Sequence, residues 1–418
     1  MLTKVDQQDI SVDSDIDYLA RVEQISDADF IKKVYKDFLW REPDAGGFQD
    51  WQERLITGDI TRHAILDNVR NSNEFRIKFD TQIRHVFIEI TNICNFHCSF
   101  CPSDLQTRDH GHISLDLFRK IVDEIVEKKL VKYVALHVMG EPTLHPQLLD
   151  ILQILNENDI TVSFNTNCGT LEDEDYIHQL MDNLYGTICL SLQTPTEQSY
   201  KLRGAGRMTW STYEEKVKTL VRHFMLVQKK RRASGMGRMS QTFISILNSS
   251  DAQVRAGGME TLEDVQHAVE KWAVFMESLE IEYDLPTYPR PQLPDYFEDN
   301  DLNQHVFIYP LQEDLYIRSA PAHTFANTRY DKRKYKIPEL NDSPQCMNPF
   351  KQMAIYWNGD ASLCCLDSDR ELQIGNVVNN SLTDVWFDQA ATDVRQSMHG
   401  LKPVPKLCGE CTACLVEK

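Results

Sequence analysis

The chain has 418 residues, 42% of them apolar and 26% charged, a composition typical of globular proteins that excludes wholesale disorder and collagen-like structure. Its 44 Lys and Arg against 63 Asp and Glu give a net charge of −19, so we expect no nucleic-acid partner. No window approaches the ~18 consecutive apolar residues of a membrane helix, and the N-terminus lacks the basic start and apolar run of a secretory signal. We therefore expect a cytoplasmic protein of two or three domains, with no membrane span and with reduced thiols.

Residues 1–26 are acidic and weakly patterned, which indicates a loosely packed lead-in. Phe30, Val34 and Phe38 recur at helical spacing and predict a small helical domain over residues 27–80. This stretch resembles a helical domain of unknown function that is often appended to glycosyltransferases and surface-polysaccharide proteins. The matching residues are Phe30, Tyr35-x-Asp37-Phe38-Leu39-x-Arg41-Glu42-Pro43-Asp44, Gly47, Trp51 and Ser72-Asn-Glu-Phe-Arg76. By association, the resemblance favours a saccharide substrate.

From residue 84, strand-like segments alternate with amphipathic helices. The strand candidates are His85–Glu89, Tyr133–Val138, Thr161–Asn165, Thr187–Leu192 and Thr242–Leu247, with Ile281, Tyr283 and Leu285 as a possible sixth. The helix candidates include Leu117–Glu127, a segment with Val217 to Val227 on one face, and one that starts at a Thr261-x-x-Asp264 capping box. Repeated βα units predict an α/β fold, a partial (βα)6 TIM-like barrel over residues 84–285 whose active site lies at the carboxyl ends of the strands.

Prolines 286, 289, 291 and 294 predict a linker over residues 286–340, followed by a small C-terminal α+β module over residues 341–418. Asn358-Gly359 lies between two short strand candidates and is a strong hairpin signal. Ser381-x-x-Asp384 predicts the start of a further helix.

The cysteines are clustered rather than scattered. Of the 11 in the chain, none precedes Cys94, and Cys94, Cys98 and Cys101 form a C-x3-C-x2-C loop directly after the first strand. A cubane iron–sulfur cluster usually takes four thiolates, so three ligands leave one iron open to bind a small molecule. A zinc loop or core thiols are the alternatives.

This loop resembles the hallmark of the radical S-adenosylmethionine (SAM) superfamily, C-x3-C-x-aromatic-C, with Phe100 as the aromatic residue. Gly140-Glu141-Pro142 follows the second strand and matches the motif that holds the SAM amino group, with Glu141 as acceptor. Thr166-Asn167-Cys168 stands where relatives often read Thr-Asn-Gly. The resemblance implies cofactor contacts by Phe100, Gly140, Glu141, Pro142, Asn167, Ser191 and Arg203.

The same resemblance implies the cofactors. They are a [4Fe-4S] cluster with one open iron, held by Cys94, Cys98 and Cys101, and SAM bound at that iron. Reductive cleavage of SAM gives a 5′-deoxyadenosyl radical that abstracts hydrogen from the substrate. The electron comes from a donor such as flavodoxin or ferredoxin.

A second set of cysteines lies in the C-terminal module. Cys346 and Cys364 are separated as C-x12-G-x4-C around Gly359, and Cys408, Cys411 and Cys414 follow at C-x2-C spacings. Four thiolates also suit zinc. The pattern resembles the SPASM and twitch extensions of radical SAM enzymes, and it implies one auxiliary [4Fe-4S] cluster on Cys346, Cys364, Cys408 and Cys411, with Cys414 able to replace one of the last pair.

Three residues that lie close together in the sequence are candidates for catalysis. If Cys364 lies on a strand, the Cys365 thiol points to the opposite face, either as a small buried hydrophobe or as a hydrogen donor in an epimerisation. Asp367 and Asp369 are either solvated carboxylates or a base in a dehydrogenation. We expect an enzyme that oxidises or epimerises a saccharide-like small molecule or glycan. The alternatives are a peptide-modifying maturase and an iron–sulfur electron carrier or sensor without SAM chemistry.

Overall fold

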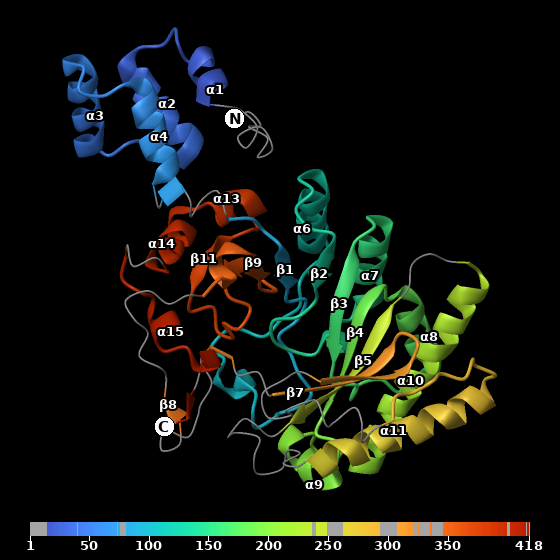
Figure 1. The fold of residues 1–418 in the computed structure, drawn as a ribbon. Helices are drawn as coiled ribbons and strands as arrows, with labels where there is room; N and C mark the ends of the chain where they lie inside the picture. The colour runs from blue at the N-terminus through green and yellow to red at the C-terminus, as the bar shows by residue number, and fades with distance from the viewer. Residues whose placement is uncertain are drawn as a thin grey trace. The chain divides into compact units, whose positions relative to one another are not determined.

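The computed structural model divides the chain into two compact units, residues 1–82 and 83–418 (Figure 1). It describes residues 15–39, 41–72, 74–75, 81–235, 240–248, 262–292, 307–321, 325–326, 335–336, 346–398, 402–414 and 416–417.

The N-terminal unit is a helical domain whose helices are α1 (Asp15–Arg21), α2 (Asp27–Leu39), α3 (Ala45–Thr57) and α4 (Arg62–Asn71). Side chains of Asp44 and Thr61 cap the N-termini of α3 and α4. The predicted apolar face of α2 is buried in the core together with residues of α4. Tyr18 and Val22 are buried in the same core, so the expectation of a loosely packed lead-in up to residue 26 is wrong from α1 onward.

The second unit is built on one ten-stranded sheet with the order β11-β10-β9-β1-β2-β3-β4-β5-β7-β6. The strands from β1 to β5 and β7 are parallel, which confirms the partial (βα)6 barrel. The bounds of the six parallel strands are β1 His85–Ile88, β2 Tyr133–Ala135, β3 Thr161–Thr166, β4 Gly186–Gln193, β5 Gln241–Asn248 and β7 Leu315–Pro321.

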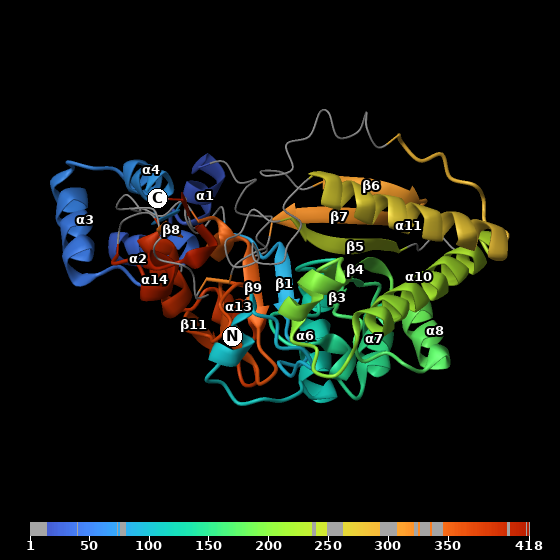
Figure 2. The ribbon, with the colours of Figure 1, turned by 90° about the horizontal axis from the view of Figure 1, so that it is seen from below.

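Helices cover one face of this sheet (Figure 2). They are α6 (Leu115–Glu127), α7 (Leu148–Glu157), α8 (Glu174–Asn183), α10 (Trp210–Ala233) and α11 (Leu262–Glu282), and the short elements α9 (Glu197–Tyr200), η1 (Pro102–Leu105), η2 (Pro142–Leu144) and η3 (Lys201–Arg203) lie in the loops. Alternate strand residues such as Ile88, Phe164 and Leu190 are buried, whereas the residues between them are only half-buried. The apolar face therefore packs under the helices, and the polar face forms the inside of the barrel.

The sixth strand lies elsewhere than expected. Ile281 belongs to α11 and is 85% exposed, so residues 281–285 do not form a strand. The sixth parallel strand is β7, reached through the antiparallel edge strand β6 (Phe307–Gln312), and both lie in the stretch expected to be a linker. Pro310 in β6 interrupts the sequence pattern of a strand, but an edge strand tolerates proline. Thr261 of the expected capping box and Pro294 lie outside the described residues.

The C-terminal module continues the barrel sheet, because β9 (Gln352–Ile355) pairs in parallel with β1. The hairpin at Asn358-Gly359 is confirmed by the antiparallel pairing of β9 with β10 (Asp360–Ser362), and Gly359 has the positive φ of 87° that the turn requires. The Ser381 capping box of α13 (Leu382–Trp386) is also confirmed. The remaining elements are β11 (Gln373–Asn376), α14 (Gln389–Ser397), α15 (Lys406–Gly409), η4 (Asn348–Phe350), η5 (Thr412–Cys414) and the pair β8 (Tyr335–Lys336) and β12 (Val416–Glu417).

None of the helices within the described ranges combines the length and the apolar character needed to cross a membrane.

Candidate functional site

The three N-terminal cysteines lie in the loop between β1 and η1. Cys98 and Cys101 are close enough to Cys94 for their charges to affect its pKa. Two N–H groups approach the Cys94 sulfur: the backbone N of Phe96 at 3.5 Å and Nδ2 of Asn167 at 3.6 Å. Burial raises the pKa of the Cys94 thiol to about 11, so metal binding must displace its proton.

The donor set fits an iron–sulfur cluster. Within the described ranges, no three His, Cys, Asp or Glu side chains converge closely enough to hold a single metal ion. A four-iron cluster takes a ligand at each corner, so its thiolates surround a volume rather than meet at one point. Three soft thiols on one short loop, with N–H donors directed at Cys94, have the chemistry that such a cluster requires.

Gly140 of the expected SAM motif and Gly204, which follows Arg203 in the sequence, pack against the backbone of this loop. Gly140 has φ 81°, and a Cβ there would lie 2.3 Å from the carbonyl oxygen of Thr91. Gly204 has φ 53°, and a Cβ there would lie 2.4 Å from the carbonyl oxygen of His97. The loop also donates from the backbone N of His97 to the oxygen of Gly204. These glycines permit a close approach that holds the cysteine loop in place.

Glu141 has an internal role that the sequence did not reveal. Its side chain is buried, and its carboxylate accepts hydrogen bonds from the backbone N and Oγ1 of Thr143, from Oγ1 of Thr166 and from the backbone N of Asn167. Burial raises the pKa of Glu141, and these hydrogen bonds oppose the rise. The contact of Glu141 with the SAM ammonium stays a prediction, and the observed bonds make Glu141 an organiser of the Thr166–Asn167 turn.

Asn167 links that turn to the cysteine loop. Its Nδ2 donates to Oδ1 of Asn95 at 2.8 Å and contacts the sulfur of Cys94 at 3.6 Å. Cys168, which follows, is buried and has φ 64°, in the left-handed region that favours glycine. Cys168 therefore keeps the backbone conformation that glycine adopts readily, at a cost in strain.

The other expected cofactor-binding residues gather around the same loop. Arg203 is buried and lies beside Cys98, with its guanidinium 5.1 Å from the Phe96 ring centre and 6.0 Å from that of Phe100. It donates through Nη1 to Gln193. Pro142 begins η2 and is buried, and the carbonyl oxygen of Ser191 accepts a hydrogen bond of 3.0 Å from the Tyr213 hydroxyl. The fold thus places Arg203 beside Phe100 of the cysteine loop and Ser191 on the inner face of β4.

The C-terminal cysteines come together from three segments of the module. Cys346 is close enough to Cys364, Cys365 and Cys408 to affect the pKa of each, and Cys411 affects that of Cys408. Burial raises the pKa of Cys408 to about 12, so iron must displace a proton here too. The side chain of Cys414 lies outside the described residues.

Cys365 does not lie on a strand, contrary to expectation. Strand β10 ends at Ser362, so Cys364 and Cys365 lie in the following turn and not on a strand. The rule that adjacent strand residues face opposite sides therefore does not apply, and Cys365 remains close to Cys346. Its thiol donates to Oε1 of Gln352 at 3.7 Å.

Asp367 is a buried turn carboxylate rather than a solvated one. Its oxygens accept hydrogen bonds from Oγ of Ser362 and from the backbone N of Glu371 and Leu372. Asp369 accepts from the backbone N and the Oγ1 of Thr107, each at 2.7 Å. We assign both carboxylates to holding loops in place.

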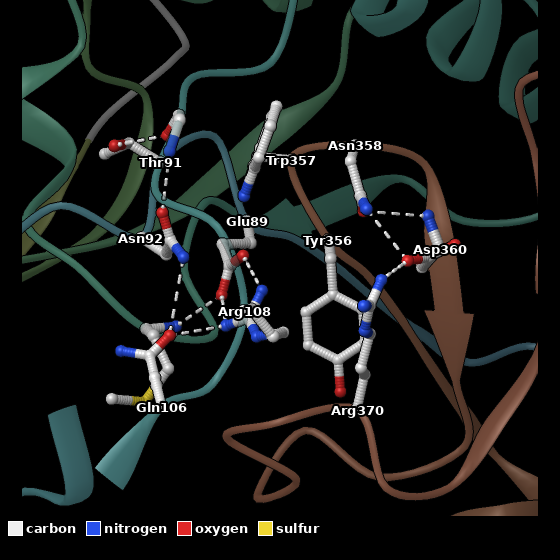
Figure 3. Close-up of polar contacts among 12 residues, drawn as sticks. Glu89, Thr91, Asn92, Gln106, Arg108, Tyr356, Trp357, Asn358, Asp360 and Arg370 are labelled. Atoms are coloured by element: carbon white, nitrogen blue, oxygen red, sulfur yellow. Dashed lines mark hydrogen bonds and ion pairs between the residues drawn. The ribbon is translucent and has the colours of Figure 1, made fainter. Parts of the chain in front are cut away.

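A buried ion pair that the sequence analysis missed lies in the barrel, and its arginine also contacts the C-terminal module (Figure 3). Arg108 donates through Nη1 and Nη2 to the two oxygens of Glu89, at 2.6 and 2.9 Å, and both side chains are almost completely buried. The guanidinium also donates through Nε to the carbonyl oxygen of Ser368 and lies 4.5 Å from the ring centre of Tyr356. Residues about 260 positions apart are thereby fixed to one another.

Further contacts join the segment that follows the cysteine loop to the C-terminal module. Asn92 donates to the carbonyl oxygen of Asp109 and accepts from the backbone N of Gly111, and Trp357 donates to the same oxygen of Asp109 at 3.1 Å. In the hairpin itself, Asp360 accepts from Asn358 and Arg370 (Figure 3). The turn between the cysteine loop and α6 is therefore held from both sides.

Family models match three separate parts of the chain. Residues 88–230 match the radical SAM superfamily, and residues 346–414 match an iron–sulfur cluster-binding domain named SPASM. Residues 17–79 match a domain of unknown function, DUF4214.

Two curated relatives have related sequences. The tungsten-containing aldehyde ferredoxin oxidoreductase cofactor-modifying protein of Pyrococcus furiosus is 23% identical over 325 residues, covering 74% of this chain and 82% of that protein. Mycofactocin maturase MftC of Mycobacterium tuberculosis is 31% identical over 119 residues, covering 28% of this chain and only 30% of its own length.

Among solved structures, SuiB of Streptococcus suis aligns with a TM-score of 0.48 at 18% identity, covering 84% of this chain and 80% of SuiB. BtrN in complex with AdoMet and 2-DOIA aligns with a TM-score of 0.41 at 13% identity, covering 77% of this chain and 89% of BtrN.

The cysteine loop after β1, the glycine motifs that support it and the matches to both domains support one assignment. The cofactors that these domains imply are a [4Fe-4S] cluster with SAM in the barrel and auxiliary iron–sulfur binding in the C-terminal module. The chain is a radical SAM enzyme: it belongs to the radical SAM superfamily and carries a C-terminal SPASM domain and an N-terminal helical domain of unknown function.

Proposed function

We propose that this radical SAM enzyme is a maturase that modifies a peptide by hydrogen abstraction. The relatives with related sequences are a maturase and a cofactor-modifying protein, which supports this class of reaction. The saccharide substrate that the N-terminal resemblance suggested has no support in these comparisons. The observation that carries the proposal is the parallel pairing of β1 with β9, which joins the barrel with the first cysteine cluster and the module with the second into one continuous sheet.

The barrel residues would prepare the reaction. Cys94, Cys98 and Cys101 would hold the cluster, which when bound supplies the electron that splits SAM. Arg203 adds a buried positive charge beside Cys98, and the bond of Asn167 to Asn95 fixes the loop against the end of β3.

The C-terminal thiols would serve a second redox step. We keep Cys346, Cys364, Cys408 and Cys411 as ligands of one auxiliary [4Fe-4S] cluster, because the first three lie close together and Cys411 lies beside Cys408. Such a cluster would accept an electron when the substrate is oxidised. Cys365 is the alternative ligand or a hydrogen donor.

The first experiment is anaerobic reconstitution followed by incubation with SAM and dithionite. We expect 5′-deoxyadenosine from the wild-type protein and none from Cys98→Ala. Iron and sulfide should correspond to two cubanes per chain. A single cubane together with bound zinc would overturn the auxiliary-cluster assignment, and the lack of 5′-deoxyadenosine would leave an iron–sulfur carrier or sensor.

The second experiment identifies the substrate class. Deuterated peptides and deuterated glycans are offered separately, and the deuterium content of 5′-deoxyadenosine is measured. We expect transfer from peptides. Transfer from glycans alone would overturn the peptide proposal and restore the saccharide hypothesis.

A further inference from the structure

The inner face of the barrel is polar where its strands lie side by side. The register pairs Asn165 of β3 with Cys189 of β4, and Ser245 of β5 with Arg318 of β7. Cys189 makes a hydrogen bond with Ser245, and Arg318 is close enough to lower the pKa of Cys189. These side chains therefore share the face that the helices leave uncovered.

Arg318 is an unusual residue on this face. It sits in the middle of β7, flanked by the buried residues Ile317 and Ser319, which point to the opposite side of the strand. Its own side chain is half-buried, yet within the described part of the chain its guanidinium makes no ion pair or hydrogen bond. By contrast, Arg108 and Arg290 are paired with carboxylates, and the buried Arg203 and Arg231 donate hydrogen bonds to side-chain or backbone oxygens.

On the same face, one ring nitrogen of His137 also lacks a partner. Nε2 of His137, just beyond β2, hydrogen-bonds Nδ2 of Asn165 at 3.1 Å, while its buried Nδ1 has no partner within the described residues. Burial lowers the pKa of His137 to about 4, so the ring is neutral at physiological pH. The inner face thus offers one fixed positive charge and one unsatisfied imidazole nitrogen, with no negative charge among the residues named here.

We propose that Arg318 binds a carboxylate of the substrate inside the barrel. A guanidinium presents N–H donors in a planar arrangement that matches a carboxylate, and partial burial strengthens the contact. In a peptide, this carboxylate is the C-terminus or an acidic side chain. The inference rests on the proposed function, since it concerns the substrate of the same site.

SAM also carries a carboxylate, so the test must separate the two sources. The probe is a tryptic digest of a uniformly deuterated protein, used as free acids and, in parallel, after methyl esterification of all carboxylates. The enzyme is the reconstituted full chain. The first readout is the rate at which phenylglyoxal modifies Arg318, followed by mass spectrometry, with exposed Arg119 as the internal control.

We expect SAM alone to change the modification rate of Arg318 less than twofold, the free-acid digest to slow it at least fivefold, and the ester digest to leave it unchanged. Arg119 should react equally throughout. Equal protection by SAM alone would assign Arg318 to the cofactor and overturn the proposal. So would equal effects of acid and ester digests, or no protection by either.

The second readout is deuterium in 5′-deoxyadenosine. We expect Arg318→Gln to lower transfer from the acid digest at least tenfold, to the level of the ester digest, and Arg318→Lys to keep part of it. The dissociation constant for SAM, measured by calorimetry, should stay within twofold. Protection of Arg318 without any deuterium transfer would contradict the proposed function but support the carboxylate site. Transfer that is unchanged in Arg318→Gln would overturn the carboxylate site alone.

Discussion

The two cysteine clusters are built in different ways. The barrel cluster takes its three thiols from eight consecutive residues, and separate motifs then pack against that loop. The C-terminal cluster takes its thiols from three segments that only the folded module brings together. The first cluster is thus encoded locally, and the second depends on tertiary structure. We therefore expect substitutions at the two clusters to have different effects on iron content and on SAM cleavage.

The largest expected difference is in SAM cleavage. Cys98→Ala should lose the barrel cluster and bring 5′-deoxyadenosine below detection. Cys364→Ala should lose only the auxiliary iron and still cleave SAM without substrate, because the barrel loop is complete without the module's thiols. Iron analysis and chromatography of the nucleoside check both variants.

The same iron analysis should show which of the adjacent thiols, Cys364 or Cys365, is the ligand of the auxiliary cluster. Cys365→Ala should keep the auxiliary iron if Cys364 is the ligand. Equal iron loss in both variants would contradict our choice of Cys364 alone.

The next largest effect concerns the buried ion pair of Arg108 and Glu89, whose arginine also contacts the C-terminal module. Arg108→Met leaves the carboxylate of Glu89 buried without its partner, so we expect a loss of about 3–5 kcal/mol in the free energy of unfolding. Denaturant titration of the reconstituted protein measures it.

The matched control for this ion pair is Arg370→Met. Arg370 is 38% exposed, and Asp360 keeps hydrogen bonds from Asn358, Gln373 and Asn376, so the loss should be about 1 kcal/mol or less. Equal losses for the two arginine variants would argue against a special role for the buried pair.

Replacement of a motif glycine should have a somewhat smaller effect. Gly140→Ala adds a Cβ against Thr91 at a positive φ, and we expect a loss of about 3 kcal/mol in unfolding free energy. Gly206→Ala shares the positive φ, but nothing lies within 4 Å of the added Cβ, so it should lose only about 1 kcal/mol. If the two losses proved equal, close packing of Gly140 on the loop would not matter for stability.

The smallest effect tests the strain at Cys168. Both Cys168→Gly and Cys168→Ala remove the buried thiol, but only glycine relieves the positive φ of 64°. We therefore expect the glycine variant to be about 1 kcal/mol more stable than the alanine variant in thermal or denaturant unfolding. A more stable alanine variant would mean that the left-handed conformation carries no strain here.

Much of this fold could be predicted because its signals are local. The first five parallel strands, the hairpin at Gly359 and the cap at Ser381 follow from alternation, turn chemistry and capping within a few residues. The last parallel strand was missed, although Leu315 and Ile317 alternate with Tyr316 and Arg318, because prolines on both sides suggested a linker. Because this strand was not expected, Arg318 was not among the candidate residues.

The sequence by itself determined that the thiols of Cys94, Cys98 and Cys101 lie on one short loop, because a C-x3-C-x2-C segment needs no distant partner to bring its thiols together. Only the tertiary structure decided that Arg108 pairs with Glu89 and donates to Ser368, that β9 joins β1, and that Asp367 is buried. The contact of Arg108 with Ser368 and the pairing of β9 with β1 each join segments about 260 residues apart, and no local pattern of polarity or turn residues specifies which distant strand or carbonyl group will be the partner.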